Sequence, residues 1–401
     1  MVTLVAGGAG SAGEMLELLR SGRAATRSDL RRLTGLSRSA VVGRVTALVD
    51  AGLVLLGSEL ASTGGRPAGG LVFNASAGVV VAVAVGRTRT QLGVFDLAGV
   101  ERAAASVEHE IGAGPDEVMP PVADELGRLL DGLPDGGDVF GIGLSLPGTV
   151  DPVRGVSIDS KVMVGWNGVP LEPYLTEVAP APLLVGNDAD VLALSERLGH
   201  AASYSNLIVV KASTGLGLGI LADGRVVSGH LGAAGEIGHT KVDAGEGRVC
   251  RCGDVGCLET VAAGWALVAG LRERDRHVEH VRDLARLALS GDAEAKQLLR
   301  DSGRQLGELL AVAINLLNPQ AVVLGGDMAA PFDVYAAGVR ETVYARASAL
   351  ATRELQFLPS TYGDRAGVVG CAAMALDHVL SPAAVDARLE RGAVRAEAEG
   401  S

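Results

Sequence analysis

The residues Gly235-Glu236-Ile237-Gly238-His239 are followed, after an interval of ten residues, by Cys250-Arg251-Cys252-Gly253-Asp254-Val255-Gly256-Cys257-Leu258-Glu259. One imidazole and three thiolates satisfy the tetrahedral coordination that Zn2+ prefers. The two glycines of the second stretch let a short loop turn its sulfurs inward. The alternative is a set of four unrelated buried residues. Because four protein ligands leave no open position, the spacing predicts a structural zinc site made of His239, Cys250, Cys252 and Cys257.

Carboxylates accompany this loop. Glu236 and Glu259 stand at its two ends, and the stretch Gly186-Asn187-Asp188-Ala189-Asp190 lies between an expected strand and an expected helix. Asp188 is either an ordinary helix N-cap or a strand-end carboxylate that accepts a proton or hydrogen bond from a hydroxyl. Convergent carboxylates suit a ligand with many hydroxyl groups. A polyhydroxyl-binding set is therefore expected from Asn187, Asp188, Glu236, His239 and Glu259.

The body of the chain alternates apolar strands with helical patterns, which predicts an α/β fold. Residues 93–100 and 219–226 read as one strand–turn–strand unit used twice. We expect two related lobes, formed by residues 78–190 with 366–380 and by residues 191–365, and a ligand-binding cleft between them. A single helix is expected over residues 258–274. The glycine-rich stretch 213–219 is either a phosphate-binding loop or a simple tight turn.

Residues 14–75 read as a separate small domain. Helical patterns with capping signals at Thr26 and Ser37, and a glycine turn at Gly35, give the outline of a helix-turn-helix. Two short strands over residues 53–56 and 70–73 resemble a wing. The alternative is a three-helix module that binds another protein. If the domain binds DNA, the third helix and the wing supply the contacts, through Ser37, Arg38, Ser39, Arg44 and Arg66.

Charge distribution supports this division. The 401 residues carry a net charge of −12, but residues 1–75 hold eight arginines and five acids, whereas the remainder holds 27 positive and 42 negative residues. Aromatic residues make up only 3%, which argues against base stacking as the main mode of recognition. Nothing in the sequence is long and apolar enough for a transmembrane helix, and residues 1–13 lack signal-peptide features. We expect a cytoplasmic protein with a loose tail at residues 1–13. Residues 382–401 are expected to form either a frayed helix or a disordered tail.

Taken together, these motifs resemble the ROK family of repressors, open reading frames and sugar kinases. The resemblance covers about residues 78–380. It rests on the Gly-Asn-Asp stretch, the Thr-Gly-x-Gly loop, Gly-Glu-Ile-Gly-His, the cysteine loop and a Val-Leu-Gly-Gly turn that ends at Gly326. It implies an actin-like, ribonuclease-H-like sugar kinase fold of two lobes, preceded here by the winged helix-turn-helix of the repressor branch. It also implies the sugar and zinc ligands named above, with Asp188 aligned to the kinases' catalytic base.

Two departures separate this chain from the kinases. Their first strand leads into Asp-x-Gly-Gly-Thr, which handles ATP phosphates and magnesium, whereas this chain has Ala84-Val85-Gly86-Arg87-Thr88. Loss of the acid, and a long side chain at Arg87, should impair phosphoryl transfer. The kinases also place an asparagine shortly before Gly-Trp, where this chain has Val162-Met163-Val164.

The expected function is a sugar-responsive repressor that binds operator DNA as a homodimer, with structural zinc and without ATP or Mg2+. One alternative is an ATP-dependent sugar kinase that carries a DNA-binding head. Another is a repressor with a vestigial pocket that responds to a protein partner.

Overall fold

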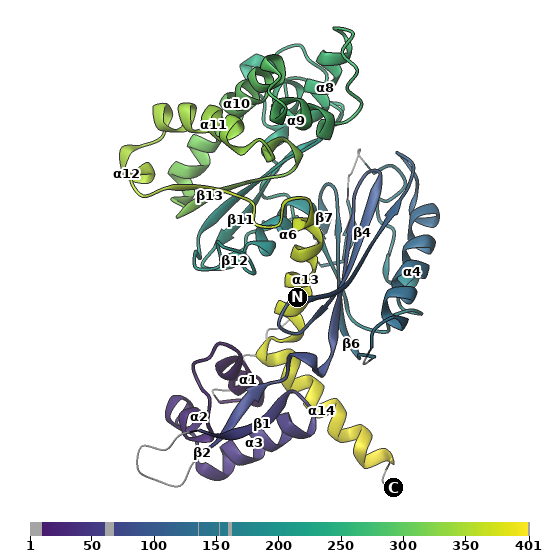
Figure 1. The fold of residues 1–401 in the computed structure, drawn as a ribbon, viewed down its shortest axis with the longest axis vertical. Helices are drawn as coiled ribbons and strands as arrows, with labels where there is room; N and C mark the ends of the chain where they lie inside the picture. The colour runs from purple at the N-terminus through teal and green to yellow at the C-terminus, as the bar shows by residue number, and fades with distance from the viewer. Residues whose placement is uncertain (1–9, 61–67, 135, 152, 159–162, 400–401) are drawn as a thin grey trace.

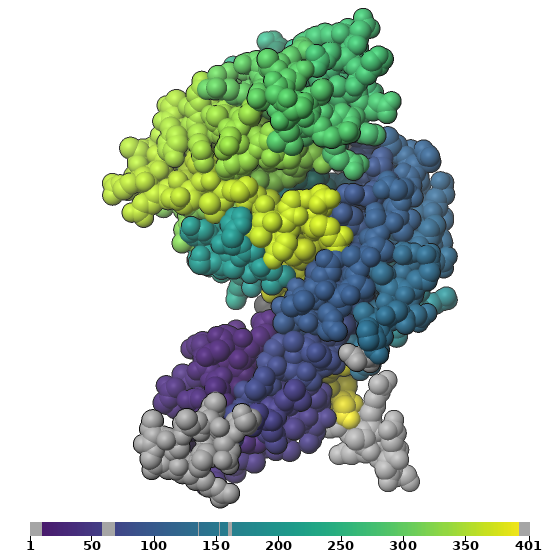
Figure 2. All heavy atoms as spheres, viewed as in Figure 1, coloured from purple at the N-terminus to yellow at the C-terminus, as the bar shows by residue number. Residues whose placement is uncertain are grey.

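The computed structural model describes residues 10–60, 68–134, 136–151, 153–158 and 163–399. The chain forms a small N-terminal head and two larger α/β lobes (Figure 1). The head extends from the first lobe, on the side away from the second lobe (Figure 2). A late helix, α13 (Ala366–Val379), lies between the two lobes (Figure 1).

The head contains α1 (Ala12–Arg20), α2 (Arg27–Thr34), α3 (Arg38–Asp50) and an antiparallel pair of strands, β1 (Val54–Leu60) and β2 (Ala68–Phe73). The predicted caps are confirmed. Thr26 forms a capping box with Asp29, and the Ser37 side chain accepts a hydrogen bond from the N–H of Ala40. Gly35 ends α2 with φ 71°, in the left-handed region that favours glycine. Buried Met15, Leu30 and Leu48 belong to the core of the head.

The expected boundary of the N-terminal tail, at residue 13, lies inside helix α1. Ser11 caps α1 by accepting a hydrogen bond from the N–H of Glu14, so the helix already begins at Ala12. The sequence pattern missed this start because Ala12 and Gly13 give no apolar periodicity.

The first lobe is built on a five-stranded sheet in the order β5-β4-β3-β6-β9. The central strand β3 (Val79–Val85) pairs antiparallel with β4 (Arg89–Asp96) and parallel with β6 (Val139–Leu146). The edge strands are β5 (Glu101–Glu108) and β9 (Leu183–Asn187). Strand β3 is buried almost throughout, as expected for a continuous apolar run. Helix α4 (Pro115–Asp131) packs on this sheet, and short elements complete the lobe: β7 (Val150–Asp151), β8 (Val156–Ser157) and α5 (Glu172–Leu175).

The second lobe repeats this topology, with the strand order β12-β11-β10-β13-β14. Its central strand β10 (Leu207–Ala212) pairs antiparallel with β11 (Leu216–Ala222) and parallel with β13 (Ala321–Gly325). The edge strands are β12 (Arg225–Val226) and β14 (Gln356–Pro359). The duplicated strand–turn–strand predicted from the sequence therefore corresponds to the β4–β5 and β11–β12 hairpins, which occupy equivalent places in the two sheets.

The helices of the second lobe differ from the prediction at one point. The helix expected over residues 258–274 is two helices, α7 (Glu259–Ala262) and α8 (Gly264–Arg272). Ala263 between them has extended backbone angles. A Cβ at Gly264 would lie 2.5 Å from the carbonyl oxygen of Ser213, so the chain packs against the β10–β11 turn here. The remaining helices are α9 (Val281–Leu289), α10 (Ala293–Leu317), α11 (Phe332–Arg346) and α12 (Ala349–Thr352).

Two helices cross between the sheets. Helix α6 (Asp188–Ser195) packs on β10 and β11 of the second lobe, and α13 packs on β3 and β6 of the first. Their backbones touch, because a Cβ at Gly370 of α13 would lie only 1.7 Å from the carbonyl oxygen of Val191 in α6. Only glycine can therefore occupy position 370 at this crossing.

Of the two alternatives for the C-terminal segment, the structure has the helix, α14 (Pro382–Glu399), and this helix reaches the head. The N–H of Gly13 donates to Asp386 Oδ1 over 2.8 Å, and Val385 is buried. A Cβ at Gly13 would lie 2.1 Å from the carbonyl oxygen of Pro382. The sparse apolar content of residues 382–401 concealed this contact, because small residues and one carboxylate make it.

Among the described residues, no single helix has the length and apolar character needed to cross a bilayer. The bent pair Gly363–Val379 and Pro382–Gly392 meets that test only by length and composition.

The α6–α13 crossing gives a stability prediction. Gly370→Ala forces the two backbones apart and should lower the free energy of unfolding by about 3 kcal/mol, the upper part of the usual range for overpacking. Thermal unfolding followed by circular dichroism measures this. Gly270→Ala in α8 is the matched control, because a Cβ there meets nothing within 4 Å and alanine favours the helix. Equal melting temperatures for the two variants would contradict a close crossing.

Candidate functional site

A cleft of about 950 Å3 separates the two lobes. The first lobe contributes the β3–β4 turn and the Pro147-Gly148 loop, and the second contributes the β10–β11 turn, the loop ending at His239 and Trp265. All five predicted polyhydroxyl-binding residues line this cleft, namely Asn187, Asp188, Glu236, His239 and Glu259. Its size and mixed lining suit a small polar ligand.

Asn187 holds the floor of the cleft together. Its Oδ1 accepts hydrogen bonds from the N–H groups of Ala189 and Asp190, at 2.7 and 3.3 Å, so Asn187 is the N-cap of α6. Its Nδ2 donates to the carbonyl oxygen of Gly148 over 2.7 Å. The simple N-cap alternative for Asp188 is therefore wrong. Asp188 is the first residue of the helix, and its carboxylate does not cap the helix.

The carboxylate of Asp188 forms an ion pair with Lys211, near the end of β10. Burial opposes the charged form of Lys211, but the neighbouring Asp188 outweighs it, and the pKa of Lys211 is raised. The ammonium group therefore stays charged and holds one side of Asp188. Sequence reasoning missed Lys211, although a lysine within the otherwise apolar strand 207–212 was a signal that could have revealed it.

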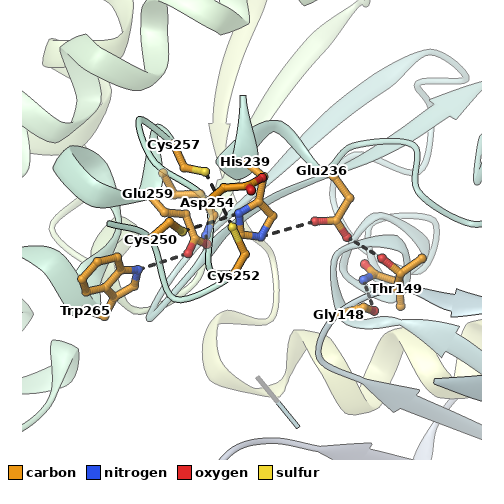
Figure 3. A network of polar contacts seen from close by, with 12 residues as sticks. Gly148, Thr149, Glu236, His239, Cys250, Cys252, Asp254, Cys257, Glu259 and Trp265 are labelled. Carbon is orange, nitrogen blue, oxygen red and sulfur yellow. Dashed lines mark hydrogen bonds and ion pairs between the residues drawn. The ribbon is translucent and has the colours of Figure 1, made fainter. Parts of the chain in front are cut away.

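Glu236 faces the first lobe. Its Oε1 accepts a hydrogen bond from Thr149 Oγ1 over 3.2 Å, and its Oε2 lies 3.9 Å from His239 Nε2 (Figure 3). Burial raises the pKa of Glu236, and the nearby Asp188 and Glu259 add to that effect, while His239 and Thr149 oppose it. The contact with Thr149 joins the lobes directly across the cleft.

His239 also faces the three cysteines. Its Nδ1 lies 3.8 Å from Cys250 Sγ, and Cys252 Sγ lies 3.7 Å from Cys257 Sγ. The four ligand atoms all lie within 4.8 Å of one another. Two thiolates on one tetrahedral zinc stand about 3.8 Å apart, as bond lengths of roughly 2.3 Å require. The arrangement therefore fits a Zn2+ ion bound through Nδ1, which leaves Nε2 turned toward Glu236 and the cleft.

Glu259 is buried beside the cluster. Its Oε1 accepts a hydrogen bond from the N–H of Leu216 over 2.8 Å, and its Oε2 accepts one from Trp265 Nε1 over 3.1 Å (Figure 3). The guanidinium carbon of Arg251 lies 4.7 Å from the centre of the Trp265 ring. These contacts fix the orientation of the carboxylate, and its remaining lone pairs are available to a ligand.

The predicted DNA contacts lie at the start of α3. Ser37, Arg38 and Ser39 are exposed there, while Val41 and Val45 face the core. The Arg44 guanidinium is half-buried and donates to the carbonyl oxygen of Ala40 over 3.4 Å. The fifth predicted contact, Arg66, lies outside the described residues. Cys371 is a buried core thiol and donates to the carbonyl oxygen of Val83.

Asp190 is a functional neighbour whose importance the sequence did not reveal. It accepts a hydrogen bond from Ser228 Oγ over 3.0 Å, which ties α6 to the loop before Gly235. Burial raises the pKa of Asp190 to about 6, Ser228 opposes this rise, and Asp188 and Glu236 add to it. Because the folded pKa exceeds the unfolded value, ionisation of Asp190 destabilises the fold as the pH rises from about 4 to about 6.

Asp190→Asn should therefore gain about 1.4 kcal/mol of stability relative to the parent protein between pH 5 and pH 7.5, because the rest of the effect is already present at pH 5. Melting temperatures of both proteins at the two pH values measure the gain. Asp151→Asn is the control, because backbone N–H groups of Arg154 and Val153 lower the pKa of that exposed carboxyl and no gain is expected. If the difference in stability between Asp190→Asn and the parent protein is the same at both pH values, the raised pKa of the buried Asp190 carboxyl is contradicted.

Known proteins resemble the chain along most of its length. The xylose repressor of Bacillus subtilis is 28% identical over 361 residues, which cover 88% of this chain and 92% of the repressor. The crystal structure of a ROK family transcriptional regulator, described as a homologue of the Escherichia coli MLC protein, matches with a TM-score of 0.80 and 25% identity, over 94% of this chain and 98% of that one.

A kinase structure matches a smaller share of this chain. The ROK family glucokinase of Streptomyces griseus, solved with glucose and AMPPNP, has a TM-score of 0.63 and 26% identity, over 74% of this chain and 99% of the kinase. The two-lobed body therefore has the ROK sugar kinase fold. The profile of the ROK family matches residues 80–378. The chain belongs to the ROK family.

Proposed function

We propose that the protein is a sugar-responsive transcriptional repressor, which binds operator DNA through its head and a sugar effector in its cleft. The observation that carries the proposal is the continuous path from cleft to head. Helix α6 begins at Asp188 in the cleft, and α13 packs on it. Helix α14 follows α13 in the chain and contacts α1 of the head. The similarity to the xylose repressor along most of both chains supports the same function.

The head acts as a winged helix-turn-helix in this proposal. Helix α3 enters the major groove, and the hairpin of β1 and β2 is the wing. The exposed side chains of Ser37, Arg38 and Ser39 lie at the N-terminal end of α3, where such helices contact base edges. Arg44 lies further along the same helix, where it reaches phosphate, and in the sequence Arg66 stands between the two strands of the wing. A homodimer would present two heads to a two-fold symmetric site.

Coupling between sugar and DNA follows from the helix path. A sugar that contacts Glu236 in the second lobe and Asp188 and the Gly148 loop at the edge of the first favours a closed cleft. Closure moves α6 against α13, and α14 passes that movement to the head through Asp386 and the Pro382–Gly13 contact. Sugar and DNA then prefer different arrangements of one molecule, which is the requirement for allostery.

This function predicts that sugar changes operator affinity by at least about fivefold, the lower bound of typical coupling. A binding site is first selected from random duplexes with the purified protein. Fluorescence anisotropy then measures the Kd of that duplex with and without xylose, glucose and glucose 6-phosphate. Arg38→Ala should weaken specific binding by about 1–3 kcal/mol if Arg38 reads a base.

The control is Arg353→Ala, which removes the same charge from an exposed site in the second lobe. Its operator affinity should equal that of the parent protein. Failure to select any DNA sequence would sink the proposed role of the head. Operator affinity unaffected by every sugar that binds would sink the coupling instead.

The metal in this proposal is a structural Zn2+ on His239, Cys250, Cys252 and Cys257. When bound, zinc crosslinks the loop 240–257 to His239. The protein residues then do the recognition, because a fixed imidazole turns Nε2 toward Glu236 and a fixed loop places Glu259 beside Trp265.

Removing the metal should therefore loosen the cleft. Treatment with a strong chelator should release about one zinc per chain, lower the melting temperature and abolish sugar binding, as measured by metal analysis, circular dichroism and calorimetry. Cys252→Ser should give the same three results. Cys371→Ser changes a thiol outside the cluster, so its zinc content should stay at that of the parent protein. Full zinc content in Cys252→Ser would refute the assigned ligand set.

The competing function is a sugar kinase with a DNA-binding head, which the similarity to the glucokinase favours. Three residues oppose it. Ala84 offers no carboxylate for magnesium, Arg87 projects from the turn that would approach ATP phosphates, and Lys211 already occupies the carboxylate of Asp188. A sugar hydroxyl would compete with a cation for the oxygen that should accept its proton. Sugar-dependent release of ADP from ATP and Mg2+ would contradict the repressor-only proposal.

A further inference from the structure

Positive side chains that line the cleft fall into two groups. Some are matched: Lys211 by Asp188, Arg89 by Asp364 at 4.0 Å, and Arg272 by the carbonyl oxygens of Val278 and Glu279. In the described part of the chain, three other arginines of the cleft lining have neither an ion pair nor a hydrogen-bond partner, namely Arg87, Arg251 and Arg282.

Arg87 comes from the first lobe. It lies in the tight turn between β3 and β4, which the hydrogen bond from Gly86 N–H to the Arg89 carbonyl oxygen closes over 2.9 Å. The turn holds the backbone of Arg87 at the mouth of the cleft and leaves its side chain partly exposed. A short turn of this kind positions a guanidinium more firmly than a long loop does.

Arg251 comes from the second lobe. It belongs to the cysteine loop between Cys250 and Cys252, and its guanidinium stacks on Trp265, which in turn donates to Glu259. Stacking fixes the plane of the guanidinium and leaves its edge N–H groups free to donate. Arg251 is therefore held beside the sugar-binding carboxylate Glu259.

The two arginines line the same cleft from opposite lobes. Two like charges in a cleft with low-dielectric walls repel each other, and a bound anion removes that repulsion. Guanidinium pairs are well matched to the planar or tetrahedral oxygens of carboxylate and phosphate groups.

We propose that the effector is an anionic monosaccharide, whose acidic group is bound between Arg87 and Arg251 while its hydroxyl groups contact Asp188, Glu236 and Glu259. The inference rests on the proposed sugar-binding function and specifies its ligand class. It also gives closure a driving force, because each lobe supplies one arginine and only an anion between them lets the lobes approach. A neutral sugar fills the polyhydroxyl set but leaves the two charges opposed.

Isothermal titration calorimetry with zinc-loaded protein tests the inference. The probes are glucose and xylose as neutral sugars, and glucose 6-phosphate and glucuronate as a phosphate ester and a carboxylate. At least one anionic probe should bind about tenfold or more tightly than glucose, and its affinity should fall as the salt concentration rises. The phosphate and carboxylate arms show which acidic group the arginines accept.

Variants identify the residues responsible. Arg87→Gln and Arg251→Lys should each weaken the anionic probe about tenfold while changing glucose binding less than twofold, because each removes guanidinium contacts but spares the carboxylates. Metal analysis confirms that Arg251→Lys, which lies between two cysteines, retains its zinc. Arg353→Gln is the matched control and should bind every probe as the parent protein does.

The outcomes are distinct. If glucose or xylose binds as tightly as both anionic probes, and Arg87→Gln binds all four like the parent protein, the anionic-effector inference is overturned while sugar sensing stands. If none of the four probes binds, both the inference and the proposed sugar-binding function are overturned. Tight anion binding that Arg87→Gln and Arg251→Lys leave intact overturns the assignment to these two side chains.

Discussion

The contact between Gly370 and the carbonyl oxygen of Val191 governs much of the molecule's geometry, because it sets the distance between the two sheets. Helix α6 packs on the second sheet and α13 packs on the first, so the lobes meet through this pair of helices. Backbones in direct contact resist compression but permit rotation about the crossing. The cleft begins at the N-terminal end of α6, so such a rotation changes its width.

Charge in the cleft is arranged around the same helix. The carboxylates of Asp188, Asp190 and Glu236 crowd together, and burial raises the pKa of both Asp190 and Glu236. Lys211 offsets part of this negative charge at Asp188. Polar ligands that donate hydrogen bonds are attracted to such a set, since each donated bond relieves an incompletely solvated carboxylate.

Local patterns predicted much of this architecture. The helix caps at Thr26 and Ser37, the duplicated strand–turn–strand and the gathering of the four metal ligands depend on residues near one another in sequence, and their chemistry is readable there. The same holds for the buried strand β3. What could not be predicted depends on contacts between distant segments. The break at Ala263 results from packing of Gly264 against Ser213. Lys211, the partner of Asp188, lies on a strand 23 residues further along the chain. Helix α14 makes its contact with the head, which lies at the other end of the chain.

The docking of α14 on α1 joins the first and the last helix of the described part of the chain. During synthesis on the ribosome, the head emerges well before the residues that will hold it. Met15, Leu30 and Leu48 of the head belong to one apolar cluster with residues of the first lobe, α13 and α14, and the head cannot acquire its final orientation until Pro382 and Asp386 have been translated. A nascent or C-terminally truncated chain would therefore carry a head that lacks its connection through α14 to the cleft.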